Sequence, residues 1–316
     1  MILTVTPNPC LDRTLFVREH KTSGNIEVER IQEIAGGKGS NVCRVLRELG
    51  SETIHLLFLG GYVGRQVLTL LEKEGIESAP VWMEAPTRVV TTVVDRNWHQ
   101  LVYFEPPPYV TENEEIAFLS RFRELGERVD MVLLCGSVPP SLLDFYEKIL
   151  VLSQNRRVLI DGRGRLLRTL LRYPFGLKMN REEAEVTWGQ PLHSEDDWQQ
   201  FFNFFFGQGV RIFLLTLGQK GALLGTPEGF YGAIPPQVET INPVGSGDAF
   251  LAAFAHVFCN TLSLEDALRW AVVAGASNAM VWEAGRVDRV WVTEHQKTVK
   301  VMKSTRLYHF QDFLKL

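Results

Sequence analysis

The 316-residue sequence lacks the cysteine patterns that would mark a metal-binding or secreted protein. Its four cysteines, Cys10, Cys43, Cys135 and Cys259, lie far apart and show no Cys-x-x-Cys spacing. This spacing indicates neither a zinc site nor a disulfide framework. We therefore expect four small, buried, reduced side chains and a cytoplasmic location.

An excess of basic charge and a long hydrophobic run are also missing. Lysine and arginine total 33 against 37 aspartates and glutamates, a net charge of −4, which gives no footprint for nucleic acid. No window approaches 18 uninterrupted apolar residues, so no membrane-spanning segment is expected. The first residues have no basic region followed by an apolar stretch of secretory length, so we expect no signal peptide.

The pattern that is present is an alternation of short apolar runs with amphipathic stretches. Hydrophobic residues make up 45% of the chain and charged residues 22%, values typical of globular domains. Strands separated by helices predict an α/β fold with a mostly parallel sheet covered on both faces. The expected strands are 2–5, 55–59, 131–134, 157–160 and 212–216, and the expected helices are 41–49, 64–74, 142–152, 249–258 and 264–282.

Three stretches depart from this alternation. Residues 15–34 and 88–104 alternate apolar and polar side chains without a helical period, which predicts a small β element that stands off the main domain as a lid. Residues 198–206 are rich in aromatic side chains. Because Trp198, Phe201, Phe202 and Phe205 fall on one helical face, they predict core packing rather than an aromatic binding site.

The segment with the strongest chemical signal is 242–250, which contains Gly245, Ser246, Gly247 and Asp248. A turn with two glycines that begins a helix exposes backbone N–H groups and the positive end of the helix dipole to an anion. A carboxylate beside such an anion site suits phosphoryl transfer, in which a base takes a hydroxyl proton. The alternative is an aspartate that caps a helix after an ordinary glycine turn.

A second glycine-rich loop, 35–41, contains Gly36, Gly37, Lys38, Gly39 and Asn41. It resembles a phosphate-binding P-loop but lacks the Ser or Thr after Gly-Lys and the earlier glycine of that motif. It offers backbone donors, one ammonium and one amide, which suit a polyhydroxy or phosphorylated ligand. A plain glycine turn before a helix is the alternative.

Two further segments suggest a nucleotide. Asn180 and Glu183 share a face if a helix begins there, and together they could hold a hydrated Mg²⁺ on nucleotide phosphates, although acidic residues are also common in a first helical turn. Thr216, Gly218 and Gly221 lie in a strand and a tight turn. This turn either places backbone against a nucleotide or simply forms a hairpin.

Taken in order and spacing, these segments resemble the phosphofructokinase B sugar kinases of the ribokinase superfamily, with the 1-phosphofructokinase and tagatose-6-phosphate kinase group as the most similar subgroup. The resemblance runs from Ile2 to about Val287. It implies one ribokinase-like α/β/α domain over 1–316, with a β-sheet lid formed by about 12–34 and 87–105 that pairs two subunits. The segments that carry it are Thr6-Pro7-Asn8-Pro9 with Leu11-Asp12, Gly36-Gly37-Lys38-Gly39 with Asn41, Thr87-Arg88, Gly136-Ser137 with Pro139-Pro140, Asn180 with Glu183, Gly218 with Gly221, and Gly245-Ser246-Gly247-Asp248.

The resemblance also implies roles for individual residues. Asp248 would be the catalytic base, and Gly245, Ser246 and Gly247 would form the anion hole. Arg88 would hold the phosphate of the substrate, for which its planar fork is suited. The remaining implied roles are sugar binding by Asp12, Gly37, Lys38, Asn41 and Ser137, ordering of Mg²⁺ and phosphate by Asn180 and Glu183, and ATP binding by Thr216, Gly218, Gly221 and the adenine-pocket stretch from Ala274 to Asn278.

Three segments differ from the usual pattern of the family. Phe104-Glu105-Pro106-Pro107 stands where Asn-Glu-Pro-Gly is usual, Asp161-Gly162-Arg163-Gly164 replaces a turn like Asp-Thr-Ser-Gly, and Lys178-Met179-Asn180 replaces Lys-Pro-Asn. The first two lie where substrate and active-site groups are usually contributed. Arg163 adds a cation that either binds a phosphate or is solvated.

We expect an ATP- and Mg²⁺-dependent kinase that converts fructose 1-phosphate to fructose 1,6-bisphosphate. The alternatives are tagatose 6-phosphate or fructose 6-phosphate as substrate, and then an unphosphorylated sugar or a nucleoside. A non-catalytic sugar-phosphate sensor is disfavoured because a binder has no need of the Asp248 carboxylate. A dinucleotide-dependent oxidoreductase is disfavoured because the first strand leads to Pro7-Asn8-Pro9 rather than to a Gly-x-Gly-x-x-Gly turn.

Overall fold

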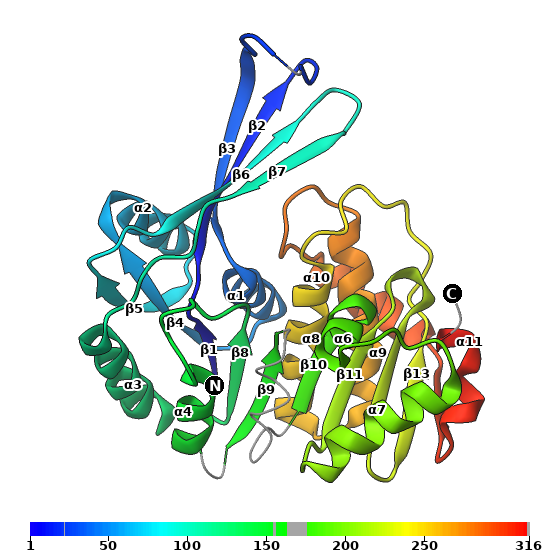
Figure 1. Ribbon diagram of the computed structural model, residues 1–316. Coiled ribbons are helices and arrows are strands. Elements are labelled where there is room, and N and C mark those ends of the chain that lie inside the picture. Colours follow the sequence, from blue (N-terminus) through cyan, green and yellow to red (C-terminus); the bar gives the residue numbers. More distant parts are fainter. Residues whose placement is uncertain (22, 154–155, 163–175, 315–316) are drawn as a thin grey trace.

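The main body of the molecule is a twisted sheet with helices on both faces (Figure 1). The computed structural model describes residues 1–314 except 22, 154–155 and 163–175. Within these residues the main sheet has ten strands in the order β14-β13-β12-β11-β10-β9-β8-β1-β4-β5. Neighbours from β11 to β5 pair in parallel, and β12, β13 and β14 add antiparallel strands at one edge, so the expected, mostly parallel sheet is confirmed. The strands are β1 (Ile2–Thr6), β4 (Thr53–Gly60), β5 (Glu77–Met83), β8 (Met131–Cys135), β9 (Arg157–Asp161), β10 (Gly176–Asn180), β11 (Ile212–Thr216), β12 (Ala222–Thr226), β13 (Gly229–Ala233) and β14 (Val301–Ser304).

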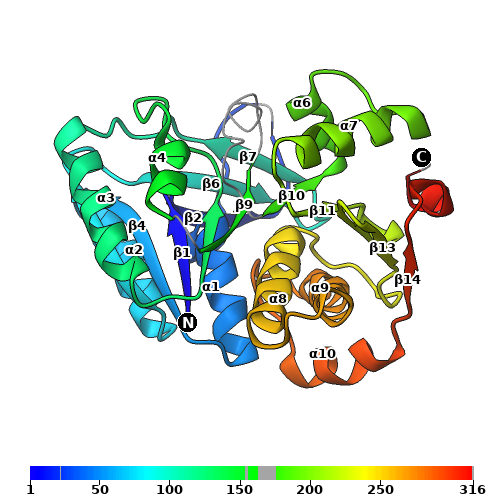
Figure 2. The same cartoon turned by 90° about the horizontal axis from the view of Figure 1, so that it is seen from below.

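Helices cover the two faces because successive side chains of each buried strand point to opposite sides. In β1, Ile2 packs into one core cluster, whereas Leu3 and Val5 pack into the other. Figure 2 shows the helical layers on either side of the sheet, which confirms the three-layer expectation. One face carries α1 (Lys38–Leu49), α2 (Gly61–Lys73), α8 (Ser246–Thr261), α9 (Leu264–Ala279) and α10 (Arg289–His295), and the other carries α3 (Glu112–Gly126), α4 (Phe145–Leu152), α6 (Arg181–Trp188), α7 (Glu195–Gly207) and the short α11 (Gln311–Leu314). Single 3₁₀ turns complete the described elements, at η1 (Gly218–Lys220), η2 (Gln296–Thr298) and η3 (Leu307–Phe310).

The aromatic stretch in α7 is core, as its spacing predicted. Trp198, Phe201, Phe202 and Phe205 are each at most 1% exposed. The neighbouring rings of Phe204 and Phe206 are partly buried and pack against the same cluster. Phe206 stacks on Phe202, and the ring of Phe204 meets those of Trp188 and Phe205.

Several expected boundaries and burials need correction. The helix expected over 264–282 ends at Ala279, because the backbone N–H groups of Ile241 and Asn242 donate to the carbonyl of Ala279. The helix expected from residue 142 begins at Phe145, after Asp144 in the left-handed region (φ 55°). All four cysteines are free, but Cys259 is only half-buried.

A second sheet stands off the main one and forms the expected β lid, at the top of Figure 1. Its order is β3-β2-β6-β7, with β2 (Cys10–Val17), β3 (Val28–Gly36), β6 (Arg88–Val94) and β7 (Gln100–Phe104). Strands β2 and β6 pair in parallel, and each is the inner strand of an antiparallel hairpin. The strand character expected over 15–34 is interrupted. No strand lies in the described residues between Val17, where β2 ends, and Val28, where β3 begins.

The topology of the main sheet places a binding site at the carboxyl ends of its strands. From β1 the chain builds outward through β4 and β5, and it then continues through β8 on the other side of β1. In open α/β sheets, ligands bind where the strand order reverses in this way. The lid leaves the sheet at the same end, directly after β1. No helix in the described part of the chain is both long and apolar enough to span a membrane.

Candidate functional site

The start of α8 combines an anion-binding turn with a buried carboxylate. Gly245 has φ 86°, and a Cβ there would lie 2.7 Å from the backbone nitrogen of Gly285, so this turn requires glycine. The Ser246 N–H donates to the carbonyl of Pro243 at 3.2 Å, and the first N–H groups of the helix have no carbonyl of their own helix to pair with. Asp248 lies in the first turn and is 6% exposed. The arrangement can therefore hold an anion beside a base.

The carboxyl group of Asp248 is tuned to ionise near neutrality. Burial and the negative charge of Asp161 raise its pKa to about 6, against the opposing effects of Lys38 and Lys178. The Asn41 side-chain N–H donates to Asp248 Oδ2 at 2.7 Å and also favours the ionised form. A carboxylate with such a pKa can accept a hydroxyl proton at physiological pH.

Two lysines and two further carboxylates lie around the Asp248 carboxyl group. Lys38 Nζ lies 2.7 Å from Asp161 Oδ1 and 3.0 Å from Glu183 Oε1, and Lys178 Nζ lies 3.0 Å from Asp161 Oδ2. Burial alone would raise the pKa of Asp161, but the two ammonium groups hold it below its ordinary value. For Lys38, burial alone would lower the pKa. The negative charges of Asp161, Asp248 and Glu183 outweigh this effect and raise the pKa of Lys38 above its ordinary value.

Sequence reasoning gave no role to Asp161 or Lys178. A Cβ at Gly247 would lie 2.7 Å from Lys178 Nζ, so this ammonium is placed at the start of α8. Asp161, the last residue of β9, and Lys178, the central residue of β10, are register partners on adjacent strands. The signal that could have found them is a charged residue within each of two buried parallel strands. Arg163 and Gly164, which follow Asp161 in the unusual turn, lie outside the described residues.

The glycine loop before α1 is packed as closely as its composition suggests. Gly37 has φ 97°, and a Cβ at Gly39 would lie 1.7 Å from Thr6 Oγ1. A Cβ at Gly36 would lie 2.3 Å from Asp12 Oδ2. The loop therefore begins α1 and also leaves room for the Asp12 side chain to pack against it. Burial raises the pKa of the Asp12 carboxyl group.

Polar groups lie at the start of the lid strand β6 and after the ends of β1 and β8. Arg88, the first residue of β6, is the register partner of Cys10 in β2, and its positive charge acts on the Asp12 carboxyl group. Arg88 Nε is buried without a hydrogen-bond partner, as is Asn8 Oδ1. The Asn8 side-chain N–H donates to Ser137 Oγ at 3.0 Å, and Ser137 itself is exposed. Arg88 Nε and Asn8 Oδ1 therefore each retain an unused capacity for one hydrogen bond.

The unusual segment from Phe104 to Pro107 closes the lid sheet. The backbone N–H of Val89 donates to Glu105 Oε2 at 2.7 Å, and the Glu105 N–H donates to the Val89 carbonyl at 3.3 Å. Phe104 is 71% exposed. This segment therefore fixes the carboxyl-terminal end of β7 to the start of β6.

A pocket of about 870 Å³ lies beside the start of α8. Its wall contains four of the residues expected at ATP or its Mg²⁺, namely Asn180, Thr216, Gly218 and Gly221, and two residues of the expected anion hole, Ser246 and Gly247. The η1 turn connects β11 and β12, which pair as an antiparallel hairpin, and the same turn lines the pocket.

Of the stretch from Ala274 to Asn278, Gly275 and Ala276 line this pocket, whereas Ala274 and Asn278 do not. The wall contributed by α9 consists of Val272, Gly275, Ala276 and Ala279, which share one face of the helix. Ala274 is fully buried in the core on the opposite side. Asn278 is also fully buried, and it donates to the Val244 carbonyl and accepts from the Gly285 N–H, so it supports the turn at the start of α8.

Asn180 and Glu183 form a capping box at the start of α6. The Glu183 N–H donates to Asn180 Oδ1 at 2.8 Å, and the Asn180 N–H donates to Glu183 Oε2 at 2.9 Å. Within the described residues no group of three or more His, Cys, Asp or Glu side chains could hold a metal ion. Because the oxygen atoms of this pair already accept hydrogen bonds, the pair fits contact with the water shell of a Mg²⁺ ion rather than direct ligation.

The loop from Trp282 to Val287 links the site to the lid. The ring of Trp282 lies 5.7 Å from that of Phe16 and 5.0 Å from that of Trp98, both in the lid. The Gln32 side-chain N–H donates to Glu283 at 2.7 Å. At the other end of the loop, the backbone N–H of Val287 donates to Glu48 of α1 at 2.7 Å.

Comparison with known proteins gives this site a family. The profile of the "pfkB family carbohydrate kinase" family matches residues 6–281, which include every residue of the site described above except those of the loop after 281. The chain belongs to the pfkB family of carbohydrate kinases. It is therefore an ATP-dependent phosphotransferase.

Individual relatives support this assignment. The kinase is 32% identical to a 1-phosphofructokinase from Bacillus subtilis over 311 residues, which cover 97% of this chain and 100% of the relative. Its fold matches that of phosphofructokinase-2 from Escherichia coli in complex with fructose-6-phosphate (TM-score 0.84, 22% identity, 94% of this chain and 98% of that chain). It also matches a protein from Thermotoga maritima described as a possible 1-phosphofructokinase (TM-score 0.81, 23% identity, 96% and 99%).

Proposed function

We propose that this kinase transfers the terminal phosphoryl group of ATP to fructose 1-phosphate and forms fructose 1,6-bisphosphate. The observation that carries the proposal is the buried Asp248 carboxylate at the start of α8, between the pocket and the glycine loop. The similarity to the Bacillus subtilis 1-phosphofructokinase supports this choice of sugar.

In the proposed mechanism, Asp248 accepts the proton of the attacking sugar hydroxyl. The Asn41 amide holds the carboxylate in place through its 2.7 Å hydrogen bond. The turn of Gly245, Ser246 and Gly247 forms the anion hole, where backbone N–H groups and the helix dipole stabilise the charge of the moving phosphoryl group. The Lys178 ammonium adds positive charge at the same place.

The proposed sugar site lies between the glycine loop and the lid, with Asp12, Gly37, Lys38, Asn41 and Ser137. Arg88 would bind the phosphate that the sugar already carries. A buried guanidinium N–H without a partner is costly, and a phosphate oxygen satisfies it with a charge-assisted hydrogen bond. This requirement favours a phosphorylated sugar over a neutral one.

ATP would occupy the pocket of about 870 Å³. Thr216, Gly218 and Gly221 would lie against its phosphates or ribose, and the apolar face of α9 at Val272 and Ala276 would receive the adenine. Asn180 and Glu183 would contact the water shell of a Mg²⁺ ion, which when bound neutralises charge on the ATP phosphates.

A panel of MgATP reactions tests the substrate. Fructose 1-phosphate should give the highest kcat/KM for ADP release, followed by tagatose 6-phosphate or fructose 6-phosphate, with fructose and nucleosides far below. A preference for an unphosphorylated sugar would contradict the role of Arg88. Tight sugar-phosphate binding without any ADP release would instead indicate a sensor.

We also infer one kinase domain over 1–316 that pairs with a second copy through the lid. All five residues of β7 are exposed, including Leu101, Val102, Tyr103 and Phe104. Exposed apolar side chains on the edge strand of a sheet are typical of a surface that another protein chain covers. Sedimentation should show a dimer that Tyr103→Glu weakens, and a wild-type monomer at micromolar concentration would refute the pairing. ATP use and four free cysteines support a cytoplasmic location.

A further inference from the structure

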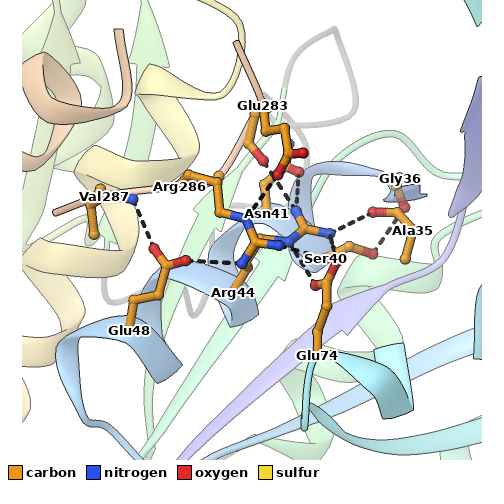
Figure 3. A network of polar contacts seen from close by, with 12 residues as sticks. Ala35, Gly36, Ser40, Asn41, Arg44, Glu48, Glu74, Glu283, Arg286 and Val287 are labelled. Atoms are coloured by element: carbon orange, nitrogen blue, oxygen red, sulfur yellow. Dashed lines mark hydrogen bonds and ion pairs between the residues drawn. The ribbon is translucent and has the colours of Figure 1, made fainter. Parts of the chain in front are cut away.

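We propose that Arg44 is a positioning residue for Asp248 that acts through the side chain of Asn41, an inference that rests on the proposed role of Asp248 as the base. Arg44 lies on α1 and is 2% exposed. Its Nη1 donates to Asn41 Oδ1 at 3.0 Å (Figure 3). Asn41 Nδ2 in turn donates to Asp248 Oδ2 at 2.7 Å. The three side chains therefore form one chain of hydrogen bonds.

Arg44 determines which end of the Asn41 amide faces the base. An amide has an acceptor oxygen at one end and a donor nitrogen at the other, and the two ends have nearly the same shape. Because Arg44 can only donate, it selects the orientation in which the oxygen faces Arg44 and the nitrogen faces Asp248. Without Arg44, the amide can turn and place its oxygen against the Asp248 carboxylate, which disfavours the ionised form.

The guanidinium group is itself fixed by four further hydrogen bonds. Its Nε and Nη2 donate to the two carboxylate oxygens of Glu74 at 2.7 and 3.2 Å. Nη2 also donates to the Ala35 carbonyl at 3.0 Å, and Nη1 donates to the Ala284 carbonyl at 3.1 Å. Ala35 begins the glycine loop, and Ala284 precedes the residue that packs against Gly245. A lysine has neither the planar shape nor the number of fixed donors to replace this arrangement.

A test by pH must take account of the other charged groups around Asp248 and Arg44. Asp248 is faced by Asp161 from β9, Lys38 from α1 and Lys178 from β10, and Cys135 of β8 lies within its field. The charge of Arg44 acts on Asp12, Cys43 and His55, and its partner Glu74 is also 3.6 Å from Arg286. None of these groups is changed in the variants below except Glu74.

The deciding variants are Arg44→Met and Arg44→Lys. Replacing Arg44 alone leaves the partly buried Glu74 carboxylate without this partner, which destabilises the fold. If a single Arg44 variant does not fold, the double variant Arg44→Met/Glu74→Leu is measured in its place. Glu74→Gln is the matched control, because it alters the same cluster while Arg44 keeps its bond to Asn41. For each protein, kcat and KM are measured with MgATP and fructose 1-phosphate from pH 5 to 9.

The acid limb of kcat should move up by about one pH unit in the Arg44 variants, the size expected from weakening one hydrogen bond to a charged group. That shift lowers kcat about fivefold at pH 6 and by about a tenth at pH 8. KM for ATP should stay within about twofold. Arg44→Lys keeps the positive charge but loses the geometry of the hydrogen bond to Asn41, so it should show the same shift as Arg44→Met. Glu74→Gln should follow the wild-type profile.

A second readout separates this inference from the proposed function. The carboxyl signal of Asp248 is followed by ¹³C NMR against pH and is assigned by its loss in Asp248→Asn. An Asp248 titration that moves up in the Arg44 variants supports the positioning role even if no sugar is phosphorylated. An unmoved titration and acid limb, with only a lower melting temperature or a uniform loss of kcat, would show that Arg44 is merely structural.

Discussion

Replacing Asp248 by asparagine removes a proton acceptor and keeps the shape of the side chain. Asparagine still has an oxygen that can accept the Asn41 hydrogen bond, but it cannot take up a hydroxyl proton. General-base catalysis contributes about 10²- to 10⁴-fold, so we expect kcat to fall by that factor. ATP affinity should change by less than about twofold, because Asp248 is not among the residues that line the pocket.

The pH profile gives an independent check on the same residue. The pKa of Asp248 is raised to about 6 by burial and by Asp161, and only the ionised carboxylate can act as a base. Wild-type kcat should therefore be half-maximal near pH 6 and should rise with pH as the group loses its proton, reaching about nine-tenths of its plateau at pH 7. In Asp248→Asn, the small remaining activity should show no limb near pH 6.

The assay is coupled ADP release from pH 5 to 9 at saturating MgATP and fructose 1-phosphate, with ATP binding followed by calorimetric titration. Near-normal turnover in Asp248→Asn would remove this residue from the mechanism. An acid limb near pH 6 that persisted in the variant would assign the titration to another group. Loss of ATP binding together with activity would point to a damaged helix start instead of a missing base.

Three other perturbations probe separate parts of the molecule. Arg88→Ala should raise KM for the sugar phosphate about 10- to 100-fold, which corresponds to a loss of about 1.4 to 2.8 kcal/mol of binding free energy. An equal loss of activity on unphosphorylated fructose would mean that Arg88 only shapes the lid. Asp161→Asn removes a negative charge that raises the pKa of Asp248, so the acid limb of kcat should move to lower pH, and a limb that moved upward would contradict the assigned cause. Trp198→Ala should lower the free energy of unfolding by about 3–5 kcal/mol in chemical denaturation while leaving kcat of the folded protein unchanged, and a stability close to wild type would show that the aromatic core of α7 can collapse around the cavity.

The fold was predictable where apolar periodicity and buried structure coincide. The runs at Ile2, His55 and Met131 predicted buried parallel strands, and the alternating stretches predicted the lid. Helix ends were less predictable because they depend on contacts from elsewhere. The end of α9 is set by backbone groups of Ile241 and Asn242, which the sequence of α9 does not contain.

The site was predictable as a set of motifs but not as a network. The glycines around Asp248 and Lys38 were visible because a turn and a helix start leave a local pattern. The ion pairs of Lys38 with Asp161 and Glu183 were not visible, since 123 and 145 residues separate the partners. Within the stretch from Ala274 to Asn278, the sequence does not show which residues line the pocket, because α9 is apolar both on its core side at Ala274 and on its pocket side at Ala276.

The loop that follows α9 has a consequence for engineering. Within four consecutive residues, Trp282 and Glu283 contact the lid, the Ala284 carbonyl accepts from Arg44, and Gly285 packs against Asn41 and Gly245. The lid is therefore not a separable module, although it is drawn from two insertions far from this loop in sequence. A chimaera that takes its lid from a relative must take residues 282–285 with it, because a lid fitted to a different loop would pull on the turn at the start of α8.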